Sequence, residues 1–346
     1  MDDRLESMYR RFTWRILSNY VSPWEFEQLR EQITDYEQWC VAWCQRAEGH
    51  IERGDEALAA GHSRTAGDAY LRAGLFYHWA SFMFSHDQEQ FRAALAGMAR
   101  AWEKAAPHLD PPMELLTVPF ENLTLNGYLR IPAGVARPPV AVLFPGADST
   151  KEELYNLGDY IVDRGIAFAA FDGPGQGSVS FEGKLRPDYE LAVQAIIDAL
   201  AARGDIDAGR LAVGGISYGG LFAIRTAAID DRVRAVVSIS SWYTPAGRFE
   251  TMEPLSRVGQ YQHLGPDPAA VMESITLAGA ADQATAPLLQ VYGGLDTQSP
   301  PALAEKVAAE YGGPVTTLVF DDGVHIVNNV WYKARPAVAD WLADTL

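Results

Sequence analysis

The sequence has little cysteine. Among 346 residues there are only Cys40 and Cys44, four positions apart in a helix-like stretch. Two cysteines far from any histidine-rich cluster exclude a disulfide framework and the usual zinc sites, so we expect both to pack in a core. No phosphate-binding loop or metal-ligand pattern occurs either, and we expect neither a metal nor a cofactor.

Positive charge and long hydrophobic runs are also scarce. Lysine and arginine total 28 against 45 aspartate and glutamate residues, a net charge of −17. This balance argues against nucleic acid and anionic membranes as partners, because both are polyanions. The start of the chain, Met1-Asp2-Asp3-Arg4-Leu5-Glu6, has no apolar signal region, and no stretch reaches membrane-spanning length. We therefore expect a cytoplasmic protein that acts on a small molecule.

Helical patterning fills the first 110 residues, which show no strand-like alternation. Ser22-Pro23-Trp24-Glu25 is typical of a helix start, with serine as N-cap and proline at the first helical position. Pro107, Pro111 and Pro112 end this region. We predict a helical cap domain over 1–110 and a catalytic domain over 111–346.

Strand patterns begin after these prolines. Leu115–Pro119 and Leu123–Ile131 alternate like a hairpin, and apolar strands then take turns with helices. The strands expected are Val140–Phe144, Ile166–Phe171, Leu211–Gly215, Ala235–Ser240, Leu288–Gly293 and Val315–Phe320, and the helices lie near Lys151–Arg164, Asp188–Ala202, Tyr218–Ile229, Ala302–Tyr311 and Lys333–Asp344. Such an order predicts the α/β class: a mostly parallel, eight-stranded sheet with helices on both faces. The mixed segment 242–286 is expected to form a lid.

Gly215-Ile216-Ser217-Tyr218-Gly219 carries the clearest chemical signal. An apolar strand pattern precedes it and a helix pattern follows, the context of a nucleophile elbow. The turn there is so tight that both flanking positions must be glycine, and it lifts the serine hydroxyl into the open. Ser217 is the predicted nucleophile.

A serine nucleophile needs a base and a group that orients the base. In this architecture the acid and the histidine follow later strands, in that order. Asp296 follows the strand pattern Leu288–Gly293, and His325 follows Val315–Phe320. Other candidates for the acid are Asp282, Asp321 and Asp322, but Asp282 precedes its strand and the other two share the loop of the histidine.

Two backbone N–H groups are the candidate oxyanion donors. Tyr218 starts a helix, which places a positive dipole end behind its N–H group. Ala147, in the loop Pro145-Gly146-Ala147-Asp148 after a strand, is the second candidate. The alternative for that loop is an ordinary glycine turn into a helix. Gly173-Pro174-Gly175-Gln176-Gly177 has the wrong spacing for dinucleotide binding, and we interpret it as a tight loop bordering the pocket.

These segments together resemble the α/β-hydrolase superfamily, and more narrowly its subgroup with an N-terminal helical domain, which includes the FrsA-like proteins and 2,6-dihydroxypseudooxynicotine hydrolase. The resemblance covers nearly the whole chain. It is carried by PGADSTKEE at 145–153, FDGPGQG at 171–177, GISYGG at 215–220, Asp296 and His325. It implies the triad Ser217, Asp296 and His325 and the oxyanion donors Ala147 and Tyr218.

The resemblance also implies an activity. Members of this subgroup cleave carbon–carbon bonds beside a ketone, and related proteins of tetronate polyketide pathways eliminate acetate. An auxiliary acid can assist, for which Glu250 and Glu253 are candidates, although such glutamates are usually solvated surface charge. The family further implies a homodimer and a role in secondary metabolism.

Three functions follow as hypotheses. The first is a serine hydrolase that cleaves a carbon–carbon bond beside a ketone, or an ester, in a medium-sized, ring-bearing metabolite. The second is an acetate-eliminating lyase that uses the same triad. The third is a non-catalytic protein whose helical part binds a partner, which a complete triad disfavours.

Overall fold

The computed structural model describes residues 2–346 and separates them into two units. One unit holds the residues up to Leu115 together with Pro254–Gly259, and the other holds Leu116–Glu253 with Gln260–Leu346. Because Pro254–Gly259 is remote in sequence, a boundary drawn along the chain alone does not include it. Within residues 2–346 no helix combines the length and the apolar character needed to cross a membrane. The same residues contain no cluster of three or more histidine, cysteine or acidic side chains arranged to hold a metal.

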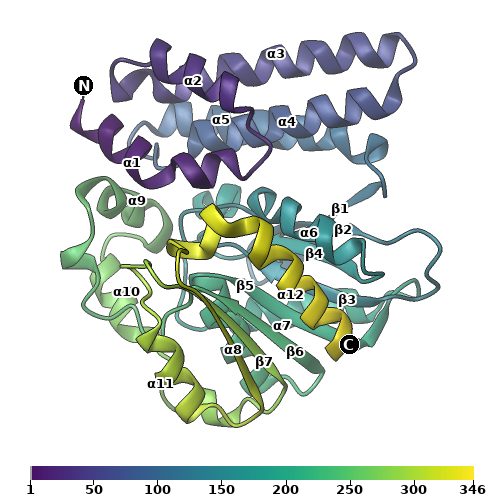
Figure 1. Ribbon diagram of the computed structural model, residues 1–346, viewed down its shortest axis with the longest axis vertical. Coiled ribbons are helices and arrows are strands. Elements are labelled where there is room, and N and C mark those ends of the chain that lie inside the picture. Colours follow the sequence, from purple (N-terminus) through teal and green to yellow (C-terminus); the bar gives the residue numbers. More distant parts are fainter. Residues whose placement is uncertain (1) are drawn as a thin grey trace. The chain divides into compact units, whose positions relative to one another are not determined.

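Five helices form where the sequence lacks strand alternation (Figure 1). They are α1 (Asp3–Leu17), α2 (Pro23–Gln32), α3 (Trp39–Ala59), α4 (Ser63–Ser81) and α5 (Gln88–Ala105). Proline occupies the first turn of α2 as predicted, where its missing N–H group has no helical partner to lose. The last three helices pack against one another. The prediction of an N-terminal all-helical region is confirmed.

Aromatic side chains fill the interior of this helical region. Trp39, Trp43 and Trp79 are fully buried, and the Trp39 indole N–H donates to the backbone oxygen of Trp79 at 2.7 Å. Cys40 is buried beside them, Cys44 is partly buried, and both are free thiols. Burial of three indoles contributes several kcal/mol of hydrophobic stabilisation to this unit.

Eight strands form one sheet, in the order β1-β2-β4-β3-β5-β6-β7-β8. β2 runs antiparallel to β4, and the pairs from β4 through β3, β5, β6 and β7 to β8 are parallel. The strands are β1 (Met113–Phe120), β2 (Leu123–Arg130), β3 (Pro139–Phe144), β4 (Ala167–Asp172), β5 (Asp207–Ile216), β6 (Val233–Ile239), β7 (Leu288–Gly293) and β8 (Val315–Phe320). The predicted eight-stranded, mostly parallel sheet is therefore confirmed, and β5 starts earlier than expected because Asp207 pairs with Pro139.

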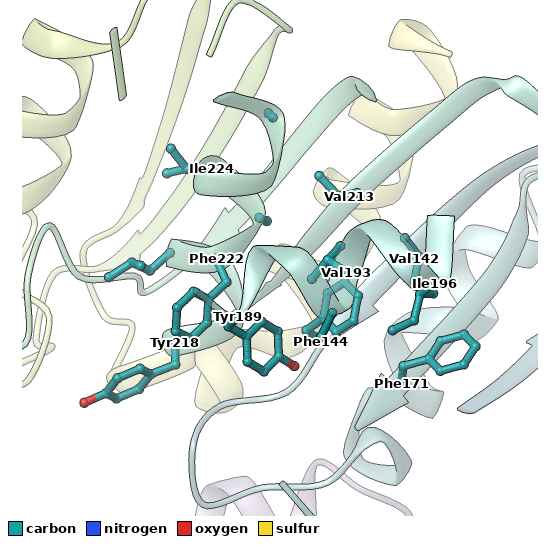
Figure 2. Packing of buried hydrophobic residues seen from close by; sticks show 14 of the residues in the cluster. Val142, Phe144, Phe171, Tyr189, Val193, Ile196, Val213, Tyr218, Phe222 and Ile224 are labelled. Atoms are coloured by element: carbon teal, nitrogen blue, oxygen red, sulfur yellow. The ribbon is translucent and has the colours of Figure 1, made fainter. Parts of the chain in front are cut away.

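Helices cover both faces of the sheet. The sequence after β3 forms α6 (Tyr155–Val162), α7 (Glu190–Ala201), α8 (Tyr218–Ile229), α11 (Ala302–Glu310) and α12 (Trp331–Thr345), and two further helices, α9 (Pro254–Leu264) and α10 (Pro268–Ser274), lie between β6 and β7 in sequence. Alternate strand residues such as Val142, Phe144 and Val213 form one cluster with Val193 of α7 and Phe222 of α8 (Figure 2). α6 and α12 pack together on the opposite face (Figure 1). The period of two in a strand divides its side chains between these two layers.

The strand order reverses direction between β3 and β5. From β3 the chain moves outward to β4 and then returns to the other side of β3. At such a switch point the loops after neighbouring parallel strands separate and leave a crevice at their carboxyl ends. Pro145–Asp148 follows β3 and Ser217 follows β5, so the fold brings these two loops together at the crevice.

The segment 242–286, which the sequence predicts to be a lid, contains α9, α10 and two short 3₁₀ turns, Phe249–Thr251 and Ala281–Gln283. The division between the two units runs through α9.

A buried ionic cluster supports the loop after β3. Lys151 Nζ lies 2.9 Å from Asp172 Oδ2 and 2.7 Å from Glu152 Oε1, and Asp172 Oδ1 accepts from the Lys151 backbone N–H at 2.7 Å. Both carboxylates are almost completely buried. Burial raises the pKa of Asp172, and the charge of Lys151 opposes that rise. One cation thus holds two carboxylates at the end of β4.

We expect Lys151→Met to lower the free energy of unfolding by about 3–5 kcal/mol, because it leaves two buried carboxylates without their cation. The loss should be larger at pH 8 than at pH 5: an acid with a raised pKa in the folded state costs stability once it ionises. Urea denaturation followed by tryptophan fluorescence measures both. Lys333→Met, which removes an exposed cation paired with Asp322 at 3.1 Å, is the matched control and should cost less than about 1 kcal/mol. Equal losses in the two variants would contradict the interpretation.

Candidate active site

Ser217 occupies a strained turn between β5 and α8. Its backbone angles are φ 53° and ψ −116°, a region that residues other than glycine rarely adopt. A Cβ atom on Gly215 would lie 2.5 Å from the backbone oxygen of Phe144, and one on Gly219 would lie 2.2 Å from the same oxygen. Glycine at both positions is thus required for β3 and the turn to approach each other. The geometry is that of a nucleophile elbow, with Ser217 at the N-terminus of α8.

Asp296 and His325 form a hydrogen-bonded pair. His325 Nδ1 lies 2.8 Å from Asp296 Oδ2, and Asp296 Oδ1 accepts from the backbone N–H groups of Gln298 and Ser299, each at 2.8 Å. Burial alone would raise the pKa of Asp296, but the His325 ring and these two N–H groups outweigh it and lower the pKa below its usual range. Asp296 is therefore a carboxylate that fixes the orientation of the imidazole and leaves Nε2 for other partners. The competing candidate Asp322 pairs with Lys333 instead.

The carboxyl end of β6 holds all three loops in place. The backbone oxygen of Ile239 accepts from the Ser217 N–H at 2.8 Å, and the Ser240 hydroxyl oxygen accepts from the Ile326 N–H at 2.9 Å. The backbone oxygen of Ser241 accepts from the hydroxyl of Ser299, on the loop of Asp296. Three consecutive residues thus tie the serine, histidine and acid loops to one strand end.

The residues after His325 are themselves strained. Ile326 and Val327 both have positive φ, 56° and 52°, which is unfavourable for β-branched side chains. They line a cavity of about 40 Å³ together with Ile216 and Ile239. That volume suits a few water molecules and is far below what a substrate requires.

The hydroxyl oxygen of Ser217 accepts a hydrogen bond from a tryptophan. Trp242 Nε1 donates to Ser217 Oγ at 3.1 Å, and the rings of Trp242 and His325 are 6.4 Å apart. Although both residues lie within the described chain, no hydrogen bond joins Ser217 to His325. Catalytic hydrogen bonds commonly form or tighten only when substrate binds. Sequence reasoning missed Trp242, because no motif surrounds it.

The loop after β3 lies against the nucleophile. A Cβ on Gly146 would be 3.5 Å from Ser217 Cβ, so the backbone of this loop approaches the serine closely. Ala147 follows directly and is buried. Tyr218 occupies the first turn of α8, whose dipole favours negative charge at that end. The placement of both residues suits the predicted role in an oxyanion hole.

Gln176 clamps this loop from behind. Its Nε2 donates to the backbone oxygens of Pro145 and Gly146 at 2.8 and 2.9 Å. Its Oε1 accepts from the Gly173 N–H at 2.9 Å and from the Tyr189 hydroxyl at 2.6 Å. Gln176 is completely buried, so all four bonds lie in a medium of low dielectric. The GPGQG segment therefore fixes the backbone that carries Ala147.

We expect Gln176→Met to lower kcat by about 10–100-fold with little change in KM, because the freed loop no longer aims the Ala147 N–H at the developing oxyanion. Gln290→Met is the matched control. Gln290 lies in β7, away from the loop, and is also fully buried. Its amide donates to Ala304 O and Thr317 Oγ1. Steady-state kinetics and thermal unfolding of both variants should show similar losses of stability but a loss of kcat in Gln176→Met alone. A parallel fall of kcat in both variants would contradict a positioning role.

The candidate auxiliary acids Glu250 and Glu253 are both exposed, in the Phe249–Thr251 turn and at the N-cap of α9. A charged side chain that the sequence did not single out is Arg248, whose guanidinium carbon lies 4.5 Å from the Trp242 ring centroid. Nothing in the sequence around Arg248 distinguishes it from a surface arginine.

Comparison with known proteins identifies the family. A model of the family "Esterase FrsA-like" matches residues 27–244, more than half of the chain. The chain belongs to the FrsA-like α/β hydrolases. A model of the prolyl oligopeptidase family matches residues 155–346, overlapping the first. The family predicted from the sequence, and the prediction that the chain is a hydrolase, are confirmed.

Individual relatives of this FrsA-like hydrolase come from bacteria and fungi. The 2,6-dihydropseudooxynicotine hydrolase of Paenarthrobacter nicotinovorans is 29% identical over 316 residues, covering 89% of this chain and 84% of the relative. The α/β hydrolase pydG of an Acremonium species is 37% identical over 224 residues, covering 61% of this chain. The match spans 52% of that fungal protein, about half its length.

Solved structures show the same fold over nearly the whole chain. The crystal structure of 2,6-dihydroxy-pseudo-oxynicotine hydrolase superposes with a TM-score of 0.88 at 27% identity, covering 96% of this chain and 95% of the other. AbyA5 superposes with a TM-score of 0.70 at 20% identity, covering 91% of this chain and 97% of its own, which shows a common fold alone.

Proposed function

We propose that Ser217, His325 and Asp296 act as a catalytic triad that cleaves a carbon–carbon bond beside a ketone, or an ester, in a medium-sized, ring-bearing metabolite. One observation carries this proposal: the strained Ser217 and the Asp296–His325 pair are tied to the same three residues at the end of β6. A strained serine costs stability. Its presence near an oriented imidazole indicates that Ser217 acts as a nucleophile.

The geometry orders the steps. His325 Nδ1 faces Asp296, so Nε2 is the atom that takes the proton of Ser217 as Oγ attacks the substrate carbonyl. The N–H groups of Ala147 and Tyr218 stabilise the resulting oxyanion. When the carbonyl re-forms, the bond to the neighbouring carbon or oxygen breaks and its electron pair leaves with that atom. His325 returns the proton to the leaving atom, and water then hydrolyses the acyl-enzyme through the same base.

The family supports the proposed substrate class. Members of the resembled subgroup cleave carbon–carbon bonds beside a ketone, where the second carbonyl of a β-diketone would stabilise the leaving carbanion as an enolate. The name of the bacterial relative, a hydrolase of 2,6-dihydropseudooxynicotine, supports a ring-bearing substrate. The fungal relatives support a role in secondary metabolism.

Turnover of benzoylacetone, a ring-bearing β-diketone, in oxygen-18 water tests the proposal. Hydrolysis through an acyl-enzyme places one heavy oxygen in the released carboxylic acid, which mass spectrometry detects. The same experiment on an O-acetylated β-hydroxyketone tests the lyase alternative, because elimination of acetate leaves its oxygens unlabelled. Unlabelled acid as the sole product would contradict hydrolysis, and turnover of aryl esters without any β-diketone cleavage would restrict the activity to esters.

A further inference from the structure

Arg248 lies one indole ring away from the nucleophile. Its guanidinium carbon is 4.5 Å from the centroid of Trp242, and the N–H of that indole donates to Ser217 Oγ at 3.1 Å. A guanidinium stacked on an aromatic face keeps its in-plane N–H donors free for another partner. Trp242 therefore connects a cation to the reacting hydroxyl.

No carboxylate lies within ion-pair distance of this cation among the described residues. The described residues supply Arg248 with no ion pair, and its Nε is buried without a hydrogen-bond partner. Seven other arginines of the same unit form ion pairs with aspartate or glutamate: Arg130, Arg164, Arg186, Arg203, Arg210, Arg225 and Arg232. A partly buried guanidinium without an acceptor is unfavourable unless a ligand provides one.

Tyr218 provides a second donor without a partner. Its side chain is 6% exposed and its hydroxyl is buried with no hydrogen bond. Figure 2 shows this hydroxyl directed away from Tyr189 and Phe222. Burial, and to a smaller degree the charge of Asp148, raises the pKa of Tyr218, so the hydroxyl stays protonated and able to donate. Arg248 also acts electrostatically on both Tyr218 and Asp296.

We propose that Arg248 and the Tyr218 hydroxyl form an anion subsite that binds a carboxylate of the substrate beside the bond that is cleaved. A carboxylate matches the planar fork of a guanidinium and accepts from a phenol hydroxyl at the same time. Asp148 near Tyr218 and Asp296 near Arg248 are the negative charges that oppose such a ligand, and Arg248 is the charge that holds it. The inference rests on the proposed function for the role of Ser217, and it adds that the natural substrate is an acid.

Arylboronic acids test the subsite, because boron bonds to a catalytic serine and mimics the tetrahedral intermediate. The probes are 3- and 4-carboxyphenylboronic acid, which hold a carboxylate one ring away from boron, and the neutral 3- and 4-carbamoyl analogues of the same shape. We expect one carboxylate isomer to bind the wild-type protein about 10–100-fold more tightly than its carbamoyl analogue in calorimetry. The advantage should vanish in Arg248→Met, persist in part in Arg248→Lys, and shrink several-fold in Tyr218→Phe, which keeps the backbone N–H.

Two controls separate the subsite from general charge and from the nucleophile. Arg210→Met removes one positive charge near the amino end of β5, remote from Ser217, and should leave the carboxylate advantage unchanged. Asp148→Asn removes the opposing charge and should increase it. Equal affinity of carboxylate and carbamoyl probes for the wild-type protein would overturn the subsite.

Failure of the proposed function has a different signature. If no boronic acid binds, Ser217 is not a reactive nucleophile, and isophthalate, which forms no adduct, becomes the probe. Binding of isophthalate that is lost in Arg248→Met then supports the subsite independently of Ser217. Binding that is absent in the wild-type protein, or unchanged in Arg248→Met, overturns it.

Discussion

We expect Ser217→Ala to lower kcat by about 10⁴–10⁶-fold. Removing the hydroxyl removes the only step in which the substrate becomes covalently attached, and the oxyanion hole alone preserves a small residual rate over water. The measurement is single-turnover and steady-state kinetics on the benzoylacetone or aryl ester probe. The free energy of unfolding should fall by about 1–3 kcal/mol at most, because alanine keeps the backbone strain and leaves the buried Trp242 indole N–H without its acceptor.

A neighbouring serine supplies the control for this prediction. Ser238 lies in β6, is completely buried, and its hydroxyl has no hydrogen-bond partner in the structure. Ser238→Ala makes the same chemical change close to the site without touching the reacting atoms, so kcat should remain within about threefold. Retention of full activity in Ser217→Ala would exclude it as the nucleophile, and the proposed function with it.

Asp296→Asn is expected to lower kcat by about 10³–10⁴-fold. The amide oxygen preserves the hydrogen bonds from Gln298 and Ser299, but the amide cannot stabilise the imidazolium, and it favours the wrong tautomer of His325. The measurement is kcat/KM between pH 6 and 9, with circular dichroism to confirm the fold. Asp322→Asn, on the histidine's own exposed loop, is the matched control and should be nearly silent.

The same carboxylate makes the free energy of unfolding depend on pH in a predictable direction. The pKa of Asp296 is lowered in the folded state, so its stabilising contribution is complete above its unfolded pKa of about 3.9 and is lost as the pH falls through the lower folded value. The difference in unfolding free energy between wild type and Asp296→Asn should therefore shrink on acidification below about pH 4. A difference that grew on acidification would contradict the ionised state of Asp296.

Much of the fold was predictable from local pattern. The runs at Leu288–Gly293 and Val315–Phe320 are strands with those same bounds. The first is buried along its whole length, as its mostly apolar run predicts, whereas the second is the edge strand and is partly exposed. The elbow was predictable for a similar reason. Gly215 and Gly219 are needed because any Cβ there would clash with the Phe144 oxygen. The close approach of β3 and β5 therefore leaves a recognisable motif of five consecutive residues.

Other features depend on contacts between segments that no local pattern marks. Gln176 clamps the loop after β3 through four bonds to residues in three separate segments, and its sequence context indicates only a tight turn. Arg248 and Trp242 lie in an irregular segment without periodicity, so only their stacking beside Ser217 distinguishes them. The exposure of Glu250 and Glu253 likewise depends on packing.

The sequence by itself therefore determined the α/β class, the helical N-terminal region, the family and the candidate triad, because each leaves periodicity or a short motif along the chain. Only the tertiary structure decided which carboxylate meets His325, that the Ser217 hydroxyl rests on Trp242, and that an unpaired arginine lies beside it. The physical reason is that hydrogen bonds and ion pairs act over a few ångströms in space. Residues separated by tens of positions come into contact only when the backbone folds, so the local sequence does not show which of them will interact.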